Sequence, residues 1–494
     1  MAKQATGAIL PNLELSTNGS PLPLYQQIYD RIREAILGGV LTPGTKLPST
    51  RTLASDLNIS RNTVEVAFMQ LEAEGFLVRQ VGAGTYVSLT IPEYVKPPKG
   101  ASRDVKTRET NDHRQQLSMR GHRIFTSGLE ADPSSGRNFA PCVPGLDSFP
   151  FKTWHRLVAR RSRYGKDELL KYGTPAGHRR LREAVASYLA TARGVKCNWN
   201  QVIILTSTQQ ALDLSSRLLL DEGEKIWFEE PGYLSARATF VSVGAKIVPI
   251  AVDNDGLDIE EGKSTSPDAR LVYITPSHQY PTGVTMSLAR RLDLLNWAAG
   301  SSAWIIEDDY DSEFRYTGRP LAAVQGLDTA GRVIYTGTFN KVLFPALRLA
   351  YLVVPEGLID AFVAARSILD GYAPTFMQSV LADFIAEGHF SAHLRRMRLL
   401  YQERREVLLE AIEKRLTPII RAGVSDTGLH VVGWLAANAD DLALSNRAAA
   451  IGLDIPPLSR YYFGPRSKPG ILLNYAAMPA KNIRQGINAL ASVL

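Results

Sequence analysis

The sequence predicts an α/β protein in which a small helical domain with a β-hairpin precedes a large domain built on a mainly parallel sheet. Between Val202 and Leu352, short β-branched runs alternate with longer amphipathic stretches, which is typical of a parallel sheet wound with helices. Polar motifs follow the ends of these predicted strands, where open α/β sheets bind ligands. The first 90 residues have a different pattern, with three helices and two short strands. At 494 residues, the chain is long enough for about two or three domains.

The N-terminal pattern begins with an amphipathic helix in PLYQQIYDRIREAILGG, which ends at Gly38 and Gly39. A turn and a short helix follow, and Ser49 is the predicted N-cap of that helix. Ser60 is the predicted N-cap of a third helix, whose buried face consists of Val64, Ala67, Phe68 and Leu71. The segment FLVRQVGAGTYV then predicts two strands joined by a glycine turn.

This order of elements predicts a winged helix-turn-helix. Arg61, Asn62 and Thr63 lie at the exposed N-terminal end of the third helix, where a recognition helix contacts base edges. The segment from PLYQQIYDRI through LPSTRTLA and SRNTV to LEAEGF resembles the GntR family of bacterial regulators over nearly the whole domain. A small helical adaptor with a β-hairpin is the alternative.

The resemblance implies DNA contacts at Arg51, Arg61, Thr63 and the wing at Gly82. Arg51 and Arg79 suit phosphate contacts, whereas Arg61 or Asn62 suits base reading, and Ser60 completes the predicted DNA surface. Charge alone gives little support for this prediction. The chain has a formal net charge of +7, but residues 1–90 contain seven basic and seven acidic residues.

A linker is expected after the winged helix. From residue 91 to 137 the hydrophobic periodicity disappears, and the segment is rich in proline, glycine and charge. We therefore expect a DNA-binding domain over 1–90, a linker over 91–137 and a large domain over 138–494. A long helix from about Phe376 through Glu413 is expected to open a small α+β lobe, over about 376–494, in which GLHVVGWLA and GILLNYAAM are strands.

The stretch TGTFNKVLFPALRLAY contains the first candidate for covalent chemistry. Lys341 follows a short strand-like run, Thr338 precedes it by three residues, and Arg348 follows it by seven. A lysine in this position can form a Schiff base with an aldehyde cofactor, and a nearby hydroxyl and guanidinium suit a phosphate.

The stretch WIIEDDYDSEF supplies a matching pair of groups. Asp308 and Tyr310 come at the end of a predicted buried strand. A pyridoxal phosphate site needs a carboxylate opposite the pyridine nitrogen and gains from a phenol beside the ring oxygen, and these two residues fit those roles. An acidic loop after a strand is the alternative explanation.

Two further segments complete the pattern. Ser207, Thr208 and Gln209 lie in a polar turn at a predicted helix start, where backbone amides bind phosphate. Tyr233 follows another strand-like run, where its ring can stack on a flat cofactor. The run VYITPSHQYPTG, Val272 to Gly283, is a further strand with a polar end.

The order of phosphate turn, PGY, PTG, EDDY and TFNK resembles the fold-type I aminotransferases, which bind pyridoxal 5'-phosphate. The sequence departs from that family twice. Tyr280 stands where catalytic members usually have an asparagine, and Leu472 stands about where the family has the arginine that binds a substrate carboxylate. Arg460 is a candidate replacement for that arginine, so Tyr280 and Arg460 are the predicted effector contacts. Both departures argue against efficient transamination of ordinary α-amino acids.

A GntR-type winged helix joined by a linker to an aminotransferase-like domain resembles the MocR subgroup of bacterial transcription regulators. The resemblance implies a domain-swapped homodimer in which the cofactor domain acts as a sensor. By this resemblance, an amine, an amino acid or pyridoxal phosphate itself would be the effector, acting through aldimine exchange at Lys341. A catalytically active aminotransferase with an appended winged helix is the alternative. Operator DNA is the expected partner, RNA polymerase is a further candidate, and no metal is expected.

Composition is consistent with a cytoplasmic protein. The chain is 45% hydrophobic and 21% charged, and no apolar run reaches the roughly 18 residues needed to span a membrane. The N-terminus lacks the apolar core of a signal peptide. With only Cys142 and Cys197, no disulfide framework is expected.

Overall fold

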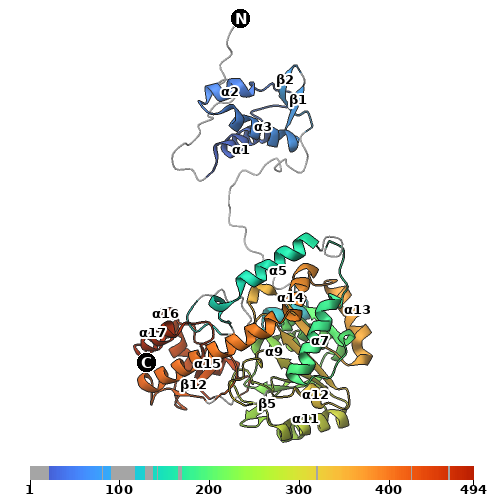
Figure 1. Ribbon diagram of the computed structural model, residues 1–494, viewed down its shortest axis with the longest axis vertical. Helices are drawn as coiled ribbons and strands as arrows, with labels where there is room; N and C mark the ends of the chain where they lie inside the picture. The colour runs from blue at the N-terminus through green and yellow to red at the C-terminus, as the bar shows by residue number, and fades with distance from the viewer. Residues whose placement is uncertain are drawn as a thin grey trace. The chain divides into compact units, whose positions relative to one another are not determined.

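The structure, a computed structural model, describes residues 22–80, 82–90, 117–127, 137–141, 143–164, 170–318, 321–423, 425–464 and 468–494. The chain divides into two compact units, Met1–His113 and Arg114–Leu494 (Figure 1). None of the helices in the described ranges is long and apolar enough to cross a membrane.

The N-terminal unit has the predicted winged-helix layout. Its elements are α1 (Leu24–Leu37), α2 (Thr50–Asp56), α3 (Arg61–Ala73), β1 (Leu77–Gln80) and β2 (Gly84–Val87). The three helices and the first wing strand enclose one apolar core, which contains Ile32, Leu53, Phe68 and Phe76. The Oγ atom of Ser49 accepts a hydrogen bond from the amide of Thr52 at 3.1 Å, and that of Ser60 accepts one from the amide of Thr63 at 3.2 Å. Both predicted N-caps therefore form.

The large unit is built on an eight-stranded sheet with the order β3-β10-β9-β8-β7-β4-β5-β6. Neighbours from β9 to β5 are parallel, whereas β10 runs antiparallel to both β9 and β3, and β6 runs antiparallel to β5. The strands are β3 (Val202–Leu205), β4 (Lys225–Glu230), β5 (Lys246–Asp253), β6 (Gly256–Leu257), β7 (Leu271–Ile274), β8 (Trp304–Asp309), β9 (Val333–Thr338) and β10 (Ala350–Val353).

Helices cover both faces of this sheet because alternate strand residues point to opposite sides. Tyr273, Ile306 and Ile334 pack with α8, α9 and α13, whereas their neighbours Val272, Ile305 and Val333 pack with α10, α11 and α12. The α-helices of this unit are α4 (Met119–Phe125), α5 (Phe151–Tyr164), α7 (Arg179–Arg193), α8 (Thr208–Leu219), α9 (Leu234–Ser242), α10 (Ile259–Thr265), α11 (Leu288–Ser301), α12 (Val324–Leu327), α13 (Ile359–Leu369), α14 (Thr375–Ala386), α15 (His389–Arg415), α16 (Asp441–Ala450) and α17 (Ala480–Ala491). The short 3₁₀ helices are η4 (Leu146–Ser148), η5 (Trp199–Gln201), η6 (Pro345–Leu347), η7 (Glu356–Leu358) and η8 (Leu458–Tyr461).

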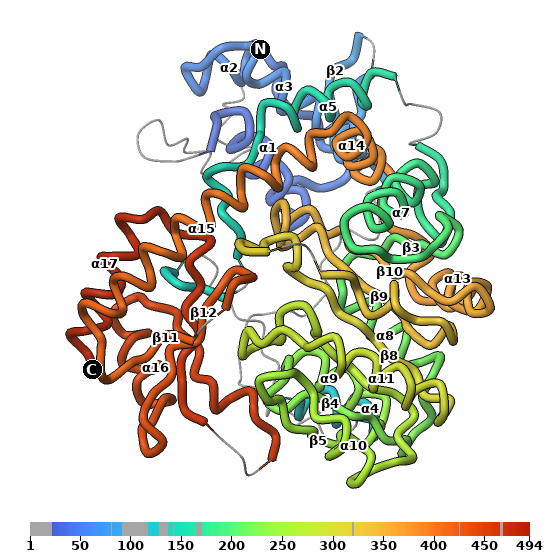
Figure 2. The backbone as a smooth tube through the Cα atoms, turned by 60° about the horizontal axis from the view of Figure 1, so that its bottom comes forward, coloured from blue at the N-terminus to red at the C-terminus, as the bar shows by residue number. Residues whose placement is uncertain are grey.

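The small lobe contains an antiparallel sheet of β11 (Arg421–Ala422), β12 (His430–Trp434) and β13 (Gly470–Asn474). Figure 2 shows α15 extending from beside α14 to this sheet, with α16 and α17 around it. The predicted single helix from Phe376 through Glu413 is wrong, because two helices, α14 and α15, occupy that range. Gly388 separates them in a left-handed conformation, with φ of 78°.

The predicted linker also differs from the structure. Its residues 119–125 form α4, which packs on α9. Ser118 caps this helix, and Arg123 forms an ion pair with Glu222 of the large unit. This part of the predicted linker is therefore docked on the large unit. The predicted linker residues 91–116 and 128–136, together with Cys142, lie outside the described residues.

Candidate functional site

The predicted cofactor residues lie at one edge of the large sheet. Because β3, β4, β7, β8 and β9 run in the same direction, their carboxyl ends meet there. Lys341 follows β9 by three residues, Asp308 lies at the end of β8, and Tyr233 precedes α9 after β4. Thr208 begins α8 after β3, and Tyr280 follows β7.

Lys341 lies among three tyrosine rings. Its Nζ is 4.4 Å from the ring centroid of Tyr310, 5.8 Å from that of Tyr233 and 5.9 Å from that of Tyr280. The side chain is half-buried, so that its amine is partly withdrawn from water without being sealed off. The structure thus brings together a reactive amine and aromatic groups that are up to 108 residues apart in the chain.

The two carboxyl oxygens of Asp308 differ in their hydrogen bonding. Its Oδ2 accepts the hydroxyl of Tyr273 at 2.9 Å, whereas its buried Oδ1 has no hydrogen-bond partner among the described residues. Burial raises the pKa of Asp308 to about 6, and the nearby charge of Lys341 opposes that rise. A protonated ring nitrogen would provide the donor that Oδ1 lacks, so the donor set fits a pyridine cofactor.

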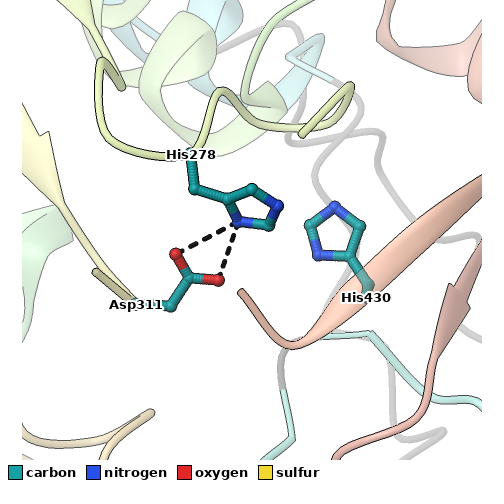
Figure 3. Close-up of side chains that lie close together, drawn as sticks. All are labelled: His278, Asp311 and His430. Atoms are coloured by element: carbon teal, nitrogen blue, oxygen red, sulfur yellow. Dashed lines mark hydrogen bonds and ion pairs between the residues drawn. The ribbon is translucent and has the colours of Figure 1, made fainter. Parts of the chain in front are cut away.

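Tyr310 is supported by residues that the sequence patterns did not indicate. The hydroxyl of Tyr310 lies 2.9 Å from Nδ1 of His278. That nitrogen also faces the carboxyl oxygens of Asp311 at 2.9 and 3.2 Å (Figure 3). His430 lies beside His278, with ring centroids 4.9 Å apart, and binds the carbonyl of Pro281 through Nε2 at 3.0 Å. A histidine inside the SHQYPTG run and the aspartate directly after EDDY were the available signals.

The same three residues have the composition of a small metal site, since ligand atoms of His278, Asp311 and His430 lie within 4.8 Å of one another. Nδ1 of His278 and Nε2 of His430 already have the protein partners described above. These contacts fix the two rings next to Tyr310 and Tyr280. We interpret the cluster as hydrogen-bonded support for Tyr310, whereas His430 contacts Tyr280 through its ring, with centroids 5.5 Å apart.

The residues predicted to contact the phosphate have different roles in the structure. Ser207 is the N-cap of α8, and its Oγ accepts the amide of Gln210 at 3.3 Å. The side chain of Gln209 is bound to the carbonyl of Ser235 and the hydroxyl of Thr239, which leaves its backbone amide for an anion.

The segment 338–348, which we call the lysine loop, comes close to the residues just before α8. Nδ2 of Asn340 lies 3.5 Å from the carbonyl of Thr206, and the Oγ1 of Thr338 accepts the amide of Asn340 at 3.1 Å. Arg348 is exposed and has a left-handed backbone with φ of 51°, which is unusual for a residue other than glycine.

The small lobe forms another side of the site. A buried cluster combines Tyr280 and Tyr310, which follow β7 and β8, with Tyr461 and three aliphatic residues. We call it the tyrosine cluster, and it consists of Tyr280, Tyr310, Val432, Leu458, Tyr461 and Leu472. The hydroxyls of Tyr280 and Tyr461 are 3.1 Å apart. Arg460, the predicted replacement for a carboxylate-binding arginine, is exposed on η8.

The residues predicted to contact DNA lie in the N-terminal unit. Arg51, Arg61 and Asn62 are exposed at or near the starts of α2 and α3, and Thr63 is half-buried. Gly82 lies in the wing turn with φ of 77°.

Arg79 has a different environment, because it donates to Glu65 at 2.7 Å and lies 3.3 Å from Glu72. These ion pairs compete with a phosphate contact.

The fold and the lysine site define a class of protein: a winged-helix DNA-binding regulator fused to a pyridoxal-phosphate-binding domain of aminotransferase type. The gntR family model of bacterial regulatory proteins matches residues 24–87, and the model of class I and II aminotransferases matches residues 147–490.

Similar proteins match this chain over both of its parts. The probable rhizopine catabolism regulatory protein MocR of Rhizobium meliloti is 41% identical over 95% of this chain and 94% of its own length. The HTH-type transcriptional regulator TauR of Rhodobacter capsulatus is 31% identical over 95% of this chain and 96% of its own. The chain belongs to the MocR subgroup of the GntR family.

A solved structure confirms the fold of the large domain. The kynurenine aminotransferase of Pyrococcus horikoshii, crystallised with PMP, is 28% identical and has a TM-score of 0.71 over 78% of this chain and 98% of its own. The cofactor of the domain is pyridoxal 5'-phosphate, and the protein is a pyridoxal-phosphate-dependent DNA-binding regulator, as the sequence predicted.

Proposed function

We propose that this regulator senses a primary amine at Lys341 and converts that binding into a change of DNA affinity. The observation that carries the proposal is the position of the Lys341 amine beside three tyrosine rings and the buried carboxyl of Asp308. These groups are the ones that we expect to hold the cofactor. Leu472 lies in its buried wall, about where the enzymes of this fold have an arginine for a substrate carboxylate.

When bound, pyridoxal phosphate supplies an aldehyde that reacts reversibly with primary amines. Lys341 would hold it covalently, Asp308 would face the ring nitrogen, Tyr310 the ring oxygen, and Tyr233 the ring face. The phosphate would be held by the start of α8 and by the lysine loop, through Ser207, Thr208, Gln209, Thr338 and Arg348. The half-buried setting of Lys341 favours an exchangeable amine, because an incoming amine can reach it.

The small lobe is the element through which we expect the signal to pass. Val432 and Leu472 are paired residues of β12 and β13, and both pack in the tyrosine cluster with Tyr280 and Tyr310. An effector that competes with Lys341 therefore alters contacts that position this lobe. Through the segment between the two units, that shift would reach the DNA-binding unit.

On the DNA side, Arg61 and Asn62 would read bases from the start of α3, with Arg51, Ser60, Thr63, Arg79 and the wing at Gly82 placed around the same duplex. We further propose a domain-swapped homodimer, which would match a two-fold operator, and action in the cytoplasm, where operator DNA lies. RNA polymerase is a further candidate partner.

The specific observation that favours a second function, a working aminotransferase, is the complete cofactor set of Lys341, Asp308 and Tyr310. The visible absorption of the purified protein, recorded with an amine panel beside Lys341→Ala, separates the two functions. The sensor predicts an absorption band that the variant lacks and that one amine shifts without release of a keto acid. Sustained keto-acid production would overturn the sensor in favour of the enzyme. A response of operator affinity to pyridoxal phosphate alone would identify the cofactor as the effector.

A further inference from the structure

The small-lobe side of the Lys341 site is uncharged. Leu472 is 1% exposed and pairs across the small sheet with Val432, and both side chains lie in the tyrosine cluster. The remaining members on this side, Leu458 and Tyr461, are aliphatic and phenolic. In the part of the chain that the structure describes, the surface opposite the lysine thus presents aliphatic carbon, aromatic faces and phenol hydroxyls.

Two arginines within the described ranges, Arg460 and Arg237, are close in sequence to residues around this site and are directed or paired elsewhere. Leu458 and Tyr461 are three residues apart on η8 and share one face of a 3₁₀ helix, so the exposed Arg460 lies on another face. Arg237, one turn after Tyr233 on α9, is half-buried; its guanidinium stacks 5.2 Å from the ring centroid of Phe463. Burial lowers the pKa of Arg237, and the charge of Glu230 opposes that shift.

Three titratable side chains described near Lys341, those of His430, Asp308 and Asp311, do not replace a guanidinium. Burial, together with the neighbouring His278, lowers the pKa of His430 to about 3, so its ring is neutral at physiological pH. Asp308 and Asp311 are carboxyl groups and offer no cationic donor to an anion. A buried carboxylate needs charge-assisted donors to offset its desolvation, and these side chains provide none.

We propose that the effector of this site is a primary amine without a carboxylate group, whose other polar groups are uncharged hydroxyls. This inference rests on the proposed sensing at Lys341 and adds the chemical class of the ligand. The hydroxyls of Tyr280 and Tyr461, 3.1 Å apart, can each donate or accept, which suits a hydroxyl of the ligand. The aromatic faces and Leu472 suit its carbon skeleton.

The covalent step is an exchange of amines and needs no oxidant or reductant. The effector nitrogen would form a double bond to the aldehyde carbon of the cofactor, and the bond from that carbon to Nζ of Lys341 would break. Lys341 would leave as a free amine and receive the two protons that the incoming amine gives up.

The test compares matched ligands on the holoprotein. Ethanolamine is L-serine without its carboxylate, and alaninol is L-alanine with the carboxylate replaced by a hydroxymethyl group. Half-saturation concentrations are read from the change in visible cofactor absorption. We expect both amino alcohols to bind at least about tenfold more tightly than their amino acids. Equal or tighter binding of the amino acids would overturn the inference.

Two variants connect the preference to the residues named. Leu472→Arg introduces a cation into the wall and should shift the serine-to-ethanolamine ratio toward serine by about tenfold or more. Leu472→Met, similar in size and uncharged, measures what the loss of the leucine shape does to both affinities. An equal shift in both variants would contradict the charge argument. The wild-type comparison still decides the question if Leu472→Arg fails to fold.

Arg237→Met tests whether the guanidinium of Arg237 binds a ligand carboxylate. We expect it to leave the ratio of the two ligands unchanged, whereas a selective loss of serine binding would show that Arg237 serves a carboxylate and would overturn the inference. If the proposed function itself is wrong, the experiment gives a different result. In that case no primary amine changes the absorption of a protein that holds the cofactor, and the inference falls together with the function.

Discussion

At the scale of single residues, Asp308 shows how a functional group reduces the stability of the protein without its ligand. The carboxyl is 4% exposed, and one of its oxygens has no hydrogen-bond partner among the described residues. Burial raises its pKa from 3.8 to about 6. The folded state therefore resists ionisation of Asp308, and this penalty is absent below about pH 4 and complete above about pH 6.

Asp308→Asn should therefore stabilise the cofactor-free protein at neutral pH. A shift of about two pKa units corresponds to roughly 3 kcal/mol, so the variant should gain up to that amount in unfolding free energy above pH 6 and nothing near pH 4. Urea unfolding followed by tryptophan fluorescence measures this gain in the large unit, because all six tryptophans lie between residues 154 and 434. The same variant should bind pyridoxal phosphate at least about tenfold more weakly.

The exposed Asp293→Asn is the matched control and should show no such pH-dependent gain. A gain from Asp308→Asn that is equal at pH 4 and pH 8 would contradict the proposed cause.

The sequence predicted the individual chemical groups of this site better than their hydrogen bonds. Lys341, Asp308, Tyr310 and Tyr233 were found because each follows a predicted strand, and parallel strands bring such positions to one edge. The support of Tyr310 by His278 was not found. It depends on the orientation of two buried side chains in successive strand-end loops, which local patterns do not specify.

At the scale of elements, the break between α14 and α15 depends on the backbone conformation of Gly388, and replacing this glycine should lower the free energy of unfolding. Gly388 has φ of 78°, and a Cβ at this position would meet no heavy atom within 4 Å. Gly388→Ala should thus destabilise the large unit through the backbone alone, by about 1–2 kcal/mol. The measurement is again tryptophan-detected urea unfolding. Gly357→Ala, where a Cβ also meets nothing within 4 Å but no positive φ is required, should change stability by less than about 0.5 kcal/mol.

The sequence prediction merged these two helices because amphipathic patterns lie on both sides of the glycine. A single glycine in a helical pattern is often tolerated, and only the backbone conformation decides whether the helix ends there. The helix α4 was missed for the opposite reason. Its 7 residues are too few to show periodicity, and it is stabilised by packing on α9 and by the ion pair of Arg123 with Glu222.

Arg61 of the recognition helix α3 and Arg79 of the wing strand β1 should differ in their importance for DNA binding. Arg61 is exposed at the start of α3, whereas Arg79 is already paired with Glu65 and Glu72. We expect Arg61→Ala to weaken binding to a duplex selected by the protein by about 1–3 kcal/mol, and Arg79→Ala to weaken it less. Fluorescence anisotropy at several salt concentrations measures both losses. Equal losses would mean that Arg79 leaves its ion pairs to contact phosphate.

At the scale of the whole molecule, the site depends on segments that are distant in sequence. Leu472 of β13 and Tyr461 of η8 pack against Tyr280 and Tyr310, so the small lobe completes the surroundings of Lys341. The order of domains was predictable because each has its own motifs. The uncharged character of this wall was visible only as the missing arginine at Leu472, and its tyrosine lining required the packed structure.

The same packing makes the proposed signal thermodynamically testable. If the amine changes DNA affinity by some factor, DNA must change amine affinity by the same factor. Coupling between two sites typically amounts to about 1–3 kcal/mol, or roughly 5–150-fold.

The most direct test of amine sensing measures the half-saturation concentration of the holoprotein for the amine that shifts its visible absorption, with and without a saturating selected duplex. The sensor predicts a change of roughly 5–150-fold that equals the change in duplex affinity caused by that amine. Lys341→Ala should abolish the amine-dependent shift in duplex affinity. Equal amine affinity with and without the duplex would show that the two units act independently and would contradict a sensing role for the Lys341 site.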